Sequence, residues 1–405
     1  MLIIGLAQGF SQLTDGDEQY FFFTNPNSAD WLEPYLGRNC HLLPSHPMKP
    51  SKQRNVFQRS AGRVRYFLQK THDKRVAKTL ASQMQAPDGV SGSNGRIEAA
   101  NIDIVHFTLQ EAFATEIPFI YHPHDLQHRH FPEFFKSEEI AWRDTVYRYF
   151  CEKAQLVSTV SSWVKKDVVE AYGLPGEKVA VVPFAPPNLG YHEPSSSDLA
   201  RAVEKFDLPS SFAFYPAQTW RHKNHIRLIE AAARAKHSGA PDMNLVFSGQ
   251  KNNYYPAIAA KVDELGMEKN VRFVGFVTPI ELQSLYRLAR CVAVPSLHEA
   301  ASFPIWEAFS AGAPVVCSSV TSLPEQVGSA AVLFDPLNTE QMSDALLTVW
   351  SDSELRNELI AKGRERVRQL TWSRTCRQFR AHYRAILRRR LTAEDKEILS
   401  APAAL

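Results

Sequence analysis

The second half of this chain repeats one pattern, a short and almost uninterrupted apolar run followed by a longer amphipathic stretch. Strands that are apolar on both faces and alternate with helices are typical of parallel sheets covered by helices on each side. The pattern therefore predicts an α/β domain. The six apolar runs occupy residues 211–216, 244–249, 271–276, 291–296, 314–319 and 330–335.

A second series of the same kind precedes it. Five apolar runs begin at Tyr20, Asn101, Ile117, Ala154 and Lys178, with amphipathic stretches between them. Residues 185–211 are rich in Pro and Ser and lack long apolar runs, which is typical of a linker. We therefore expect a first α/β domain over 1–185, a linker over 186–211 that ends in a short helix, a second domain over 212–371 and a final helical segment over 372–405.

Composition limits the class of protein. The 405 residues are 44% hydrophobic and 22% charged, which is enough for two globular domains. The net charge of +3 does not call for nucleic acid as a partner, and no apolar run reaches the roughly 18–20 residues that span a bilayer. The five cysteines are scattered, as in a reducing cytosol, and the first ten residues lack the basic start of a signal peptide. We expect a cytoplasmic protein.

Charged residues follow two of the predicted strands of the second domain. Lys223 comes a few residues after the run 211–216, and Glu299 comes a few residues after the run 291–296. Ligands of parallel α/β sheets bind at the carboxyl ends of the strands. Both side chains should therefore lie at this edge, and Glu307 follows in the first turn of a helix that contains Pro304.

These residues resemble the donor site of retaining glycosyltransferases of the GT-B fold. The resemblance is carried by Lys223-Asn224, by the spacing of Glu299 and Glu307 and by Gly312 and Pro314 after them, and the family is glycosyltransferase family 4, also called group 1. It implies two Rossmann-like domains with parallel sheets facing a central cleft. The first domain would serve the acceptor and the second a nucleotide sugar, with the final helix crossing back to the first.

The resemblance also implies roles. Glu299 would lie near the hexose and Glu307 would bind the ribose hydroxyls, while Lys223 and the start of the Pro304 helix would neutralise the leaving diphosphate without a metal. The alternatives without a binding site are that Lys223 is a surface lysine, that Glu299 is a solvated loop charge and that Glu307 is favoured by the helix dipole. The remaining candidates for donor binding are Gln218, Arg221, Asn224, Ala300, Ala301, Ser302 and Phe303.

This chain departs from the family pattern at two places. The usual E-G-F-G-L-P is Glu299-Ala300-Ala301-Ser302-Phe303-Pro304, so both glycines are replaced. The usual G-R before the lysine is Ala217-Gln218, and Arg221 is a candidate to compensate for the missing charge. Gln218 followed by HKNH resembles mannosyltransferases of surface-polysaccharide synthesis.

Four histidines, His122, His124, His128 and His130, follow the run that begins at Ile117. Imidazoles at short spacing suit zinc, but no carboxylate or cysteine completes a familiar ligand pattern. By resemblance, His124-Asp125 would instead face the donor sugar as part of the catalytic site. The alternative is that the two residues only cap the helix that follows.

Three features near the start carry further expectations. Asp15-Gly16-Asp17 imitates a metal-binding D-x-D motif but precedes a strand, so we expect a turn. Residues 2–13 are predicted to form a helix, and the strand and Gly-rich loop that precede it in the family are absent, through a misplaced start or a truncation. Residues 49–78 carry ten basic residues against Asp73, which suits an anionic membrane surface or a helix with a solvated basic side.

The resemblance therefore implies a retaining, metal-independent glycosyltransferase without a cofactor. It would move a hexose, with mannose favoured, from a GDP- or UDP-sugar to a glycan or polyprenyl-linked acceptor, in the cytoplasm or peripherally at the inner face of the membrane. The alternatives are a nucleotide-sugar epimerase on the same fold and a family member that binds the donor without turnover. A nicotinamide dehydrogenase is disfavoured because no G-x-G-x-x-G follows a predicted strand.

Overall fold

The computed structural model describes residues 2–24, 31–44, 86–187 and 193–401. Contacts divide the chain into two compact units. The first unit comprises Met1–Thr159, Lys165–Val182 and Trp372–Ala404, and the second comprises Val160–Val164 and Pro183–Thr371. The basic stretch 49–78 lies outside the described residues. No helix within the described ranges is both long and apolar enough to cross a membrane.

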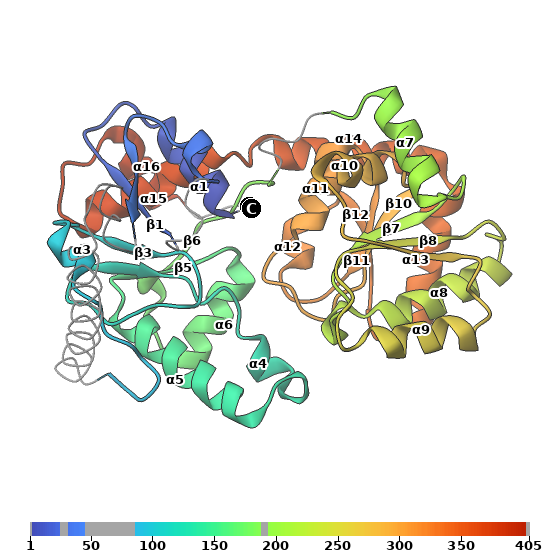
Figure 1. Ribbon diagram of the computed structural model, residues 1–405, viewed down its shortest axis with the longest axis horizontal. Coiled ribbons are helices and arrows are strands. Elements are labelled where there is room, and N and C mark those ends of the chain that lie inside the picture. The colour runs from blue at the N-terminus through green and yellow to red at the C-terminus, as the bar shows by residue number, and fades with distance from the viewer. Residues whose placement is uncertain (1, 25–30, 45–85, 188–192, 402–405) are drawn as a thin grey trace, which may run out of the picture. The chain divides into compact units, whose positions relative to one another are not determined.

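The first unit is an α/β structure whose strands are all parallel (Figure 1). Its four-stranded sheet has the order β3-β4-β5-β6, and β1 pairs with β2 in a separate two-stranded sheet. The strands are β1 (Tyr20–Thr24), β2 (Cys40–Pro44), β3 (Val105–Phe107), β4 (Phe119–Tyr121), β5 (Leu156–Thr159) and β6 (Val179–Val181). Its main helices are α1 (Leu2–Ser11), α3 (Arg96–Ala99), α4 (Gln127–His130), α5 (Ser137–Lys153), α6 (Ser162–Tyr172), α15 (Trp372–Ile386) and α16 (Ala393–Ser400).

All five apolar runs predicted in the first half contain a strand. The strand β2 was not predicted, because its sequence Cys-His-Leu-Leu-Pro contains only two strongly apolar side chains in succession. It is stabilised by its parallel register with β1, in which Tyr20 lies opposite Cys40 and Phe22 opposite Leu42. Pairing with β1 therefore stabilises a strand that the sequence pattern of β2 did not predict.

Close packing joins α1 to α15 at the two ends of the chain. A Cβ atom at Gly5 would lie 2.1 Å from the indole of Trp372, and one at Gly9 would lie 2.5 Å from Sγ of Cys376. The two helices thus approach closely because neither position carries a side chain. The predicted helix over 2–13 is confirmed as α1, and α15 contributes to the core of the first unit with Phe379.

The Asp15-Gly16-Asp17 segment is a bend, as predicted. Its two carboxylates pair with arginines at the C-terminal end of the chain, Asp15 with Arg380 and Asp17 with Arg389. The hydrogen bond from Arg380 lowers the pKa of Asp15 to about 2. Asp15 thus links the bend to α15, and Asp17 links it to the segment that follows α15.

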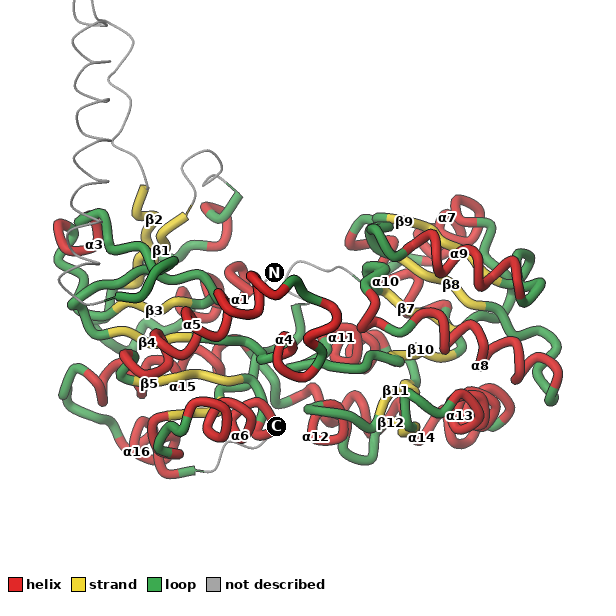
Figure 2. The backbone as a smooth tube through the Cα atoms, turned by 90° about the horizontal axis from the view of Figure 1, so that it is seen from below, coloured by secondary structure: helices red, strands yellow, loops and turns green. Residues whose placement is uncertain are grey.

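The second unit contains one six-stranded parallel sheet of order β12-β11-β10-β7-β8-β9. The six predicted strands are all present, as β7 (Ala213–Pro216), β8 (Leu245–Ser248), β9 (Val271–Gly275), β10 (Cys291–Val294), β11 (Val315–Ser318) and β12 (Ala331–Phe334). The helices are α7 (Ser196–Phe206), α8 (His225–His237), α9 (Tyr255–Glu264), α10 (Pro279–Leu288), α11 (Phe303–Ala311), α12 (Leu323–Val327), α13 (Thr339–Ser351) and α14 (Ser353–Arg368). Figure 2 shows α8 and α13 on one side of this sheet and α10 and α11 on the other.

The order of the strands reverses between β7 and β10. From β7 the chain builds outward through β8 and β9, and it then crosses back to β10 and builds outward through β11 and β12 on the other side. In parallel α/β sheets, ligands commonly bind at such a reversal point, at the carboxyl ends of the strands. Within the segment expected as a linker, α7 packs against α10 and belongs to the second unit.

Candidate active site

Lys223 and Glu299 meet at this reversal point of the second sheet. Lys223 ends a single 3-10 turn (Arg221–Lys223) after β7, and Glu299 lies in the loop after β10. The Lys223 Nζ atom lies 2.6 Å from Oε1 of Glu299. Their side chains are only 22% and 12% exposed, so the ion pair is sheltered from solvent screening.

The carboxylate of Glu299 is held in its ionised form. Burial by itself would raise its pKa, but the charge of Lys223 and the hydrogen bonds from Lys223 and Ser296 outweigh burial and lower the pKa below its usual value. Ser296 donates its hydroxyl proton to the same oxygen, Oε1, at 2.6 Å. The site therefore presents an anion at neutral pH.

The backbone of Glu299 is fixed by the loop that follows β11. Its N–H donates to Oγ1 of Thr321 at 3.2 Å, and its carbonyl accepts hydrogen bonds from the hydroxyls of Thr321 and Ser322. Thr321 has a positive φ of 52°, which a non-glycine residue rarely adopts. Three loops of the sheet edge thus converge on one glutamate.

Asn224 holds this edge together from within. Its side-chain amide donates to the carbonyls of Pro295 and Pro336, which follow β10 and β12, and its Oδ1 atom accepts from Arg227. Its backbone is left-handed with φ of 60°. The amide hydrogens bond to the protein and the residue is buried, so Asn224 shapes the loops at this edge of the sheet.

The segment from Ala300 to Phe303 leads into α11. Ala300, Ala301 and Phe303 are half-buried, and Ser302 precedes the first helical residue. The Ser302 N–H donates to Oε1 of Gln326 at 2.8 Å, while the Ser302 carbonyl accepts from Nε2 of Gln326 at 2.7 Å. The buried Gln326 of α12 therefore fixes the peptide at the start of α11.

The predicted position of Glu307 in the first turn of its helix was wrong. The helix α11 begins at Phe303, so Glu307 is its fifth residue and lies past the first turn of 3.6 residues. It is 6% exposed, and its Oε2 atom accepts a hydrogen bond of 2.7 Å from the hydroxyl of Tyr286 on α10. Interaction with the free N–H groups at the helix start therefore does not explain this buried glutamate.

Gln218 and Arg221 lie in the loop after β7, and both are exposed. The Gln218 Oε1 atom accepts from the indole N–H of Trp220 at 3.0 Å. The loop is pressed against the next one, because a Cβ atom at Gly249 would lie 2.8 Å from the carbonyl of Ala217. Gly249, with φ of 124°, thus allows a close approach that a side chain would prevent.

His124 and Asp125 follow β4 in the first unit. His124 has a positive φ of 61°, and its Nε2 atom lies 2.9 Å from the Thr108 carbonyl, which can only accept, so Nε2 carries the proton. Burial lowers its pKa, although the bond to Thr108 opposes this, and the ring is neutral at neutral pH. The Asp125 carboxylate accepts from the N–H of Gln127, the first residue of α4, although Leu126 is the N-cap residue of that helix.

The other histidines of this stretch do not converge. His122 stacks on His106 of β3, with 5.0 Å between the ring centroids. His128 and His130 pair with different carboxylates, Asp144 and Asp167. Throughout the described part of the chain, no group of three or more His, Cys, Asp or Glu residues is arranged to hold a metal ion.

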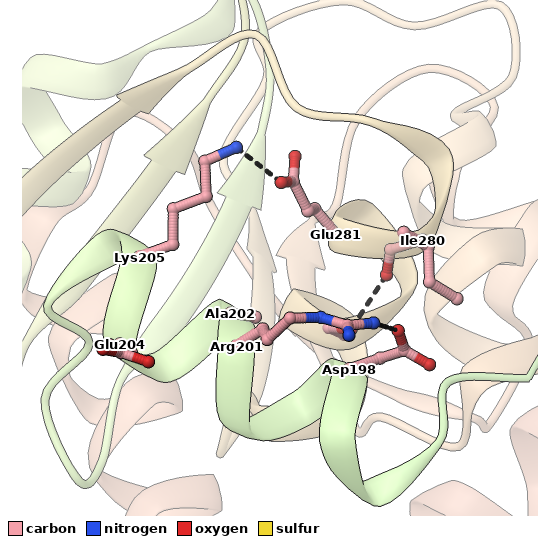
Figure 3. A pocket seen from close by; sticks show the side chains of 8 residues that line it. Asp198, Arg201, Ala202, Glu204, Lys205, Ile280 and Glu281 are labelled. Atoms are coloured by element: carbon pink, nitrogen blue, oxygen red, sulfur yellow. Dashed lines mark hydrogen bonds and ion pairs between the residues drawn. The ribbon is translucent and has the colours of Figure 1, made fainter.

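A surface hollow of about 390 Å³ lies between α7 and α10, away from these residues. Its charged side chains neutralise one another, since Lys205 pairs with Glu281 and Arg201 pairs with Asp198 (Figure 3). None of the residues that line this hollow is among the site residues at the sheet edge. The hollow therefore contributes no group to the candidate active site.

Among the residues of the site that were not predicted from the sequence are Tyr215, which lies 2.9 Å from Ser296, and Ser296, Thr321 and Gln326. Tyr215 and Ser296 lie at the carboxyl ends of β7 and β10, where a polar residue inside an apolar run was a usable signal. Thr321 and Gln326 come from a loop and a short helix with no motif of their own. Only the folded sheet places them beside Glu299 and Ser302.

Two family models match the chain. The one described as Glycosyl transferases group 1 matches residues 196–366, and the one described as Glycosyltransferase Family 4 matches residues 83–184. O-antigen chain mannosyltransferase B of Escherichia coli is 27% identical over 250 residues, which are 62% of this chain and 65% of that protein. D-inositol 3-phosphate glycosyltransferase of Corynebacterium glutamicum is 36% identical over 123 residues, 30% of this chain and 29% of that protein. The chain thus spans less than two thirds of the length of these relatives.

Solved glycosyltransferase structures share the fold. Anabaena Alr3699/HepE in complex with UDP and glucose is 17% identical with a TM-score of 0.66, covering 95% of both chains. WaaG, a glycosyltransferase involved in lipopolysaccharide biosynthesis, is 15% identical with a TM-score of 0.58, covering 88% of this chain and 96% of that one. These likenesses confirm the expected GT-B fold class of two Rossmann-like domains with parallel sheets. The two family models, which between them match residues 83–184 and 196–366, show that the chain is a group 1 glycosyltransferase.

Proposed function

We propose that this protein transfers a hexose, with mannose favoured, from a nucleotide-diphosphate sugar to a glycan or lipid-linked acceptor. The observation that carries the proposal is the Lys223–Glu299 pair at the reversal point of the second sheet, 2.6 Å apart and sheltered. A sugar diphosphate needs a cation for its phosphates and an acceptor for its hydroxyls, and this pair offers both. Mannose is favoured because two relatives are named O-antigen chain mannosyltransferases.

In the proposed division of roles, Lys223 and the start of α11 bind the phosphates and Glu299 binds the hexose. Charge accumulates on the leaving diphosphate in the transition state, where fixed positive groups are most effective. Glu307, buried beside Tyr286, is assigned to the ribose hydroxyls, and Gln218 and Arg221 are assigned to the outer part of the donor. His124 and Asp125 would act from the first unit, on the sugar.

The proposed reaction retains the anomeric configuration and needs no divalent metal. The leaving phosphate would accept the proton of the acceptor hydroxyl on the same face of the sugar, so no enzyme base is required. The acceptor would be a surface-polysaccharide precursor, and residues 49–78 are proposed to bring the protein to an anionic membrane. A cytoplasmic or peripheral inner-membrane location follows from that substrate.

Equilibrium binding tests the donor site directly. Thermal unfolding is recorded with GDP, UDP, ADP and their hexose derivatives, since a ligand that binds the folded state raises its stability. We expect one nucleotide series to raise the midpoint in the wild type and in Lys205→Met, which removes a surface ion pair, but not in Lys223→Met. If no nucleotide raises the wild-type midpoint, the proposed function is wrong. Sugar epimerised at C2 without an acceptor would indicate the epimerase instead.

A further inference from the structure

The carboxylate of Glu299 is held by more than its lysine partner. Two hydrogen bonds of 2.6 Å converge on its Oε1 atom, one from Nζ of Lys223 and one from Oγ of Ser296. No hydrogen bond to Oε2 occurs in the described part of the chain. One oxygen is thus committed to the protein, and the other is left for a ligand hydroxyl.

Ser296 is in turn held by Tyr215. The Tyr215 hydroxyl lies 2.9 Å from Oγ of Ser296 and 3.2 Å from the carbonyl of Lys223. Tyr215 is 1% exposed and Ser296 is fully buried, so water does not replace either bond. The phenol therefore touches both loops that carry the charged pair, the one after β7 and the one after β10.

The direction of these bonds follows from counting protons. A carboxylate only accepts, so Ser296 donates its single proton to Glu299. Its oxygen must then accept from Tyr215, whose one proton points to Ser296 or is shared with the carbonyl of Lys223. Burial keeps the phenol protonated, since it raises the pKa of Tyr215 well above its usual value. The bond from Ser296 to Glu299 thus has a fixed direction, and the one proton of Tyr215 lies between Ser296 and the carbonyl of Lys223.

We propose that Tyr215 and Ser296 are positioning residues, which orient Glu299 so that its Oε2 atom meets a hydroxyl of the donor hexose while Lys223 stays beside it. This inference rests on the proposed function and deepens it. The electrostatic surroundings of Glu299 are Lys223 and His222 after β7 and the neutral phenol of Tyr215. Of the two groups that bond to Oε1 of Glu299, Ser296 is neutral, so its hydroxyl can be removed without changing the charge of the site.

Titration of Glu299 in the ligand-free protein tests the proposal without any activity. Glutamate is labelled with ¹³C, the Glu299 signal is assigned by its loss in Glu299→Gln, and its pKa is followed in each variant. Removing the hydroxyl in Ser296→Ala should raise the pKa of Glu299, because a hydrogen bond to the charged form is lost. Ser296→Thr keeps a hydroxyl and should return the value toward the wild type. An unchanged titration in Ser296→Ala would overturn the proposal.

Kinetics with GDP-mannose as the probe supply the second measurement. Ser296→Ala should lower kcat about ten- to a hundredfold with a smaller change in KM, and Tyr215→Phe should lower it less. The control Ser284→Ala removes a similarly buried hydroxyl that donates to the Ile280 carbonyl of its own helix, and it should leave kcat unchanged. Equal losses in Ser284→Ala and Ser296→Ala would mean a general packing effect and contradict the positioning role.

The two measurements separate the two proposals. If the wild type turns over no sugar nucleotide but the Glu299 titration moves as described, the positioning role stands and the proposed donor is wrong. If turnover is normal and neither readout responds to Ser296→Ala, the proposed function stands and the positioning role is wrong. Circular dichroism of each variant confirms that it is folded before either result is used.

Discussion

Lys223 and Glu299 are 76 positions apart in the chain, yet Nζ of one lies 2.6 Å from Oε1 of the other. The contact exists because β7 and β10 are neighbours in the sheet although β8 and β9 separate them in sequence. In the ligand-free protein the two charges neutralise each other. A sugar diphosphate that binds here must share Lys223 with Glu299, and this couples the phosphate end of the donor to its hexose end.

Lys223→Met should lower the rate of transfer by about a hundred- to a thousandfold, because a cation that stabilises the leaving diphosphate is lost. The substitution also removes the charge that keeps the pKa of Glu299 low, while the burial that raises it remains. The acid limb of the pH–rate profile should therefore move to higher pH. Rates measured from pH 5 to 9 check both effects, with Lys205→Met as the matched control. A higher KM with an unchanged kcat would contradict a role of Lys223 in the transition state.

Chelation of divalent metals should leave transfer intact, because Lys223 and the start of α11 supply the positive charge in the proposed mechanism. Initial rates are compared with and without EDTA after dialysis. Activity that disappears with EDTA and returns with added Mg²⁺ or Mn²⁺ would refute the metal-independent mechanism. The anomeric configuration of the product, read by NMR, independently tests retention.

Gln326→Ala should lower both stability and turnover. The substitution removes two hydrogen bonds to the Ser302 backbone. It leaves the buried N–H unsatisfied, which costs about 1–3 kcal/mol, while the carbonyl still accepts from the N–H of Ile305. Urea unfolding gives the stability, and kcat/KM should fall further than the stability change explains. Gln341→Ala, which removes one bond to the N–H of Asp335 at an exposed site, serves as the control. Wild-type turnover in folded Gln326→Ala would argue against this bracing role.

Gly5→Ala should destabilise the first unit by about 1–3 kcal/mol through overpacking. The added methyl group would lie 2.1 Å from the Trp372 indole, so α1 and α15 must move apart. Thermal unfolding measures the loss. Gly176→Ala adds a methyl group where no heavy atom lies within 4 Å, and it should have little effect. Equal midpoints for the two variants would show that α1 and α15 are not closely packed.

The Asp15–Arg380 pair should contribute stability that depends on pH. The pKa of Asp15 is about 2 in the folded protein, below the value of about 3.9 for an unperturbed aspartate. A lowered carboxyl pKa stabilises the folded state above the unfolded value, and this contribution is lost as pH falls toward 2. The difference in unfolding free energy between wild type and Asp15→Asn should thus be constant above about pH 5 and shrink below pH 4. A difference that is flat from pH 3 to 7 would contradict the pairing.

The sequence by itself determined the strands of the second unit and the edge at which the site lies. Its apolar runs are long enough to be read without tertiary context, and a charged residue that follows such a run must lie at the carboxyl end of the strand. Lys223 and Glu299 could therefore be placed at one edge. The strand β2 could not be found in this way, because it is stabilised mainly by its pairing with β1.

Only the tertiary structure decided which groups act on the predicted residues. The start of α11 at Phe303 moved Glu307 past the first turn and placed its carboxylate beside Tyr286 of α10. The side chain of Asn224 was committed to loops that follow two other strands. Hydrogen bonds act over about 3 Å, whereas residues such as Ser302 and Gln326 are distant in sequence and carry no shared pattern. Local periodicity predicts where strands end, but only folding determines which loops meet there.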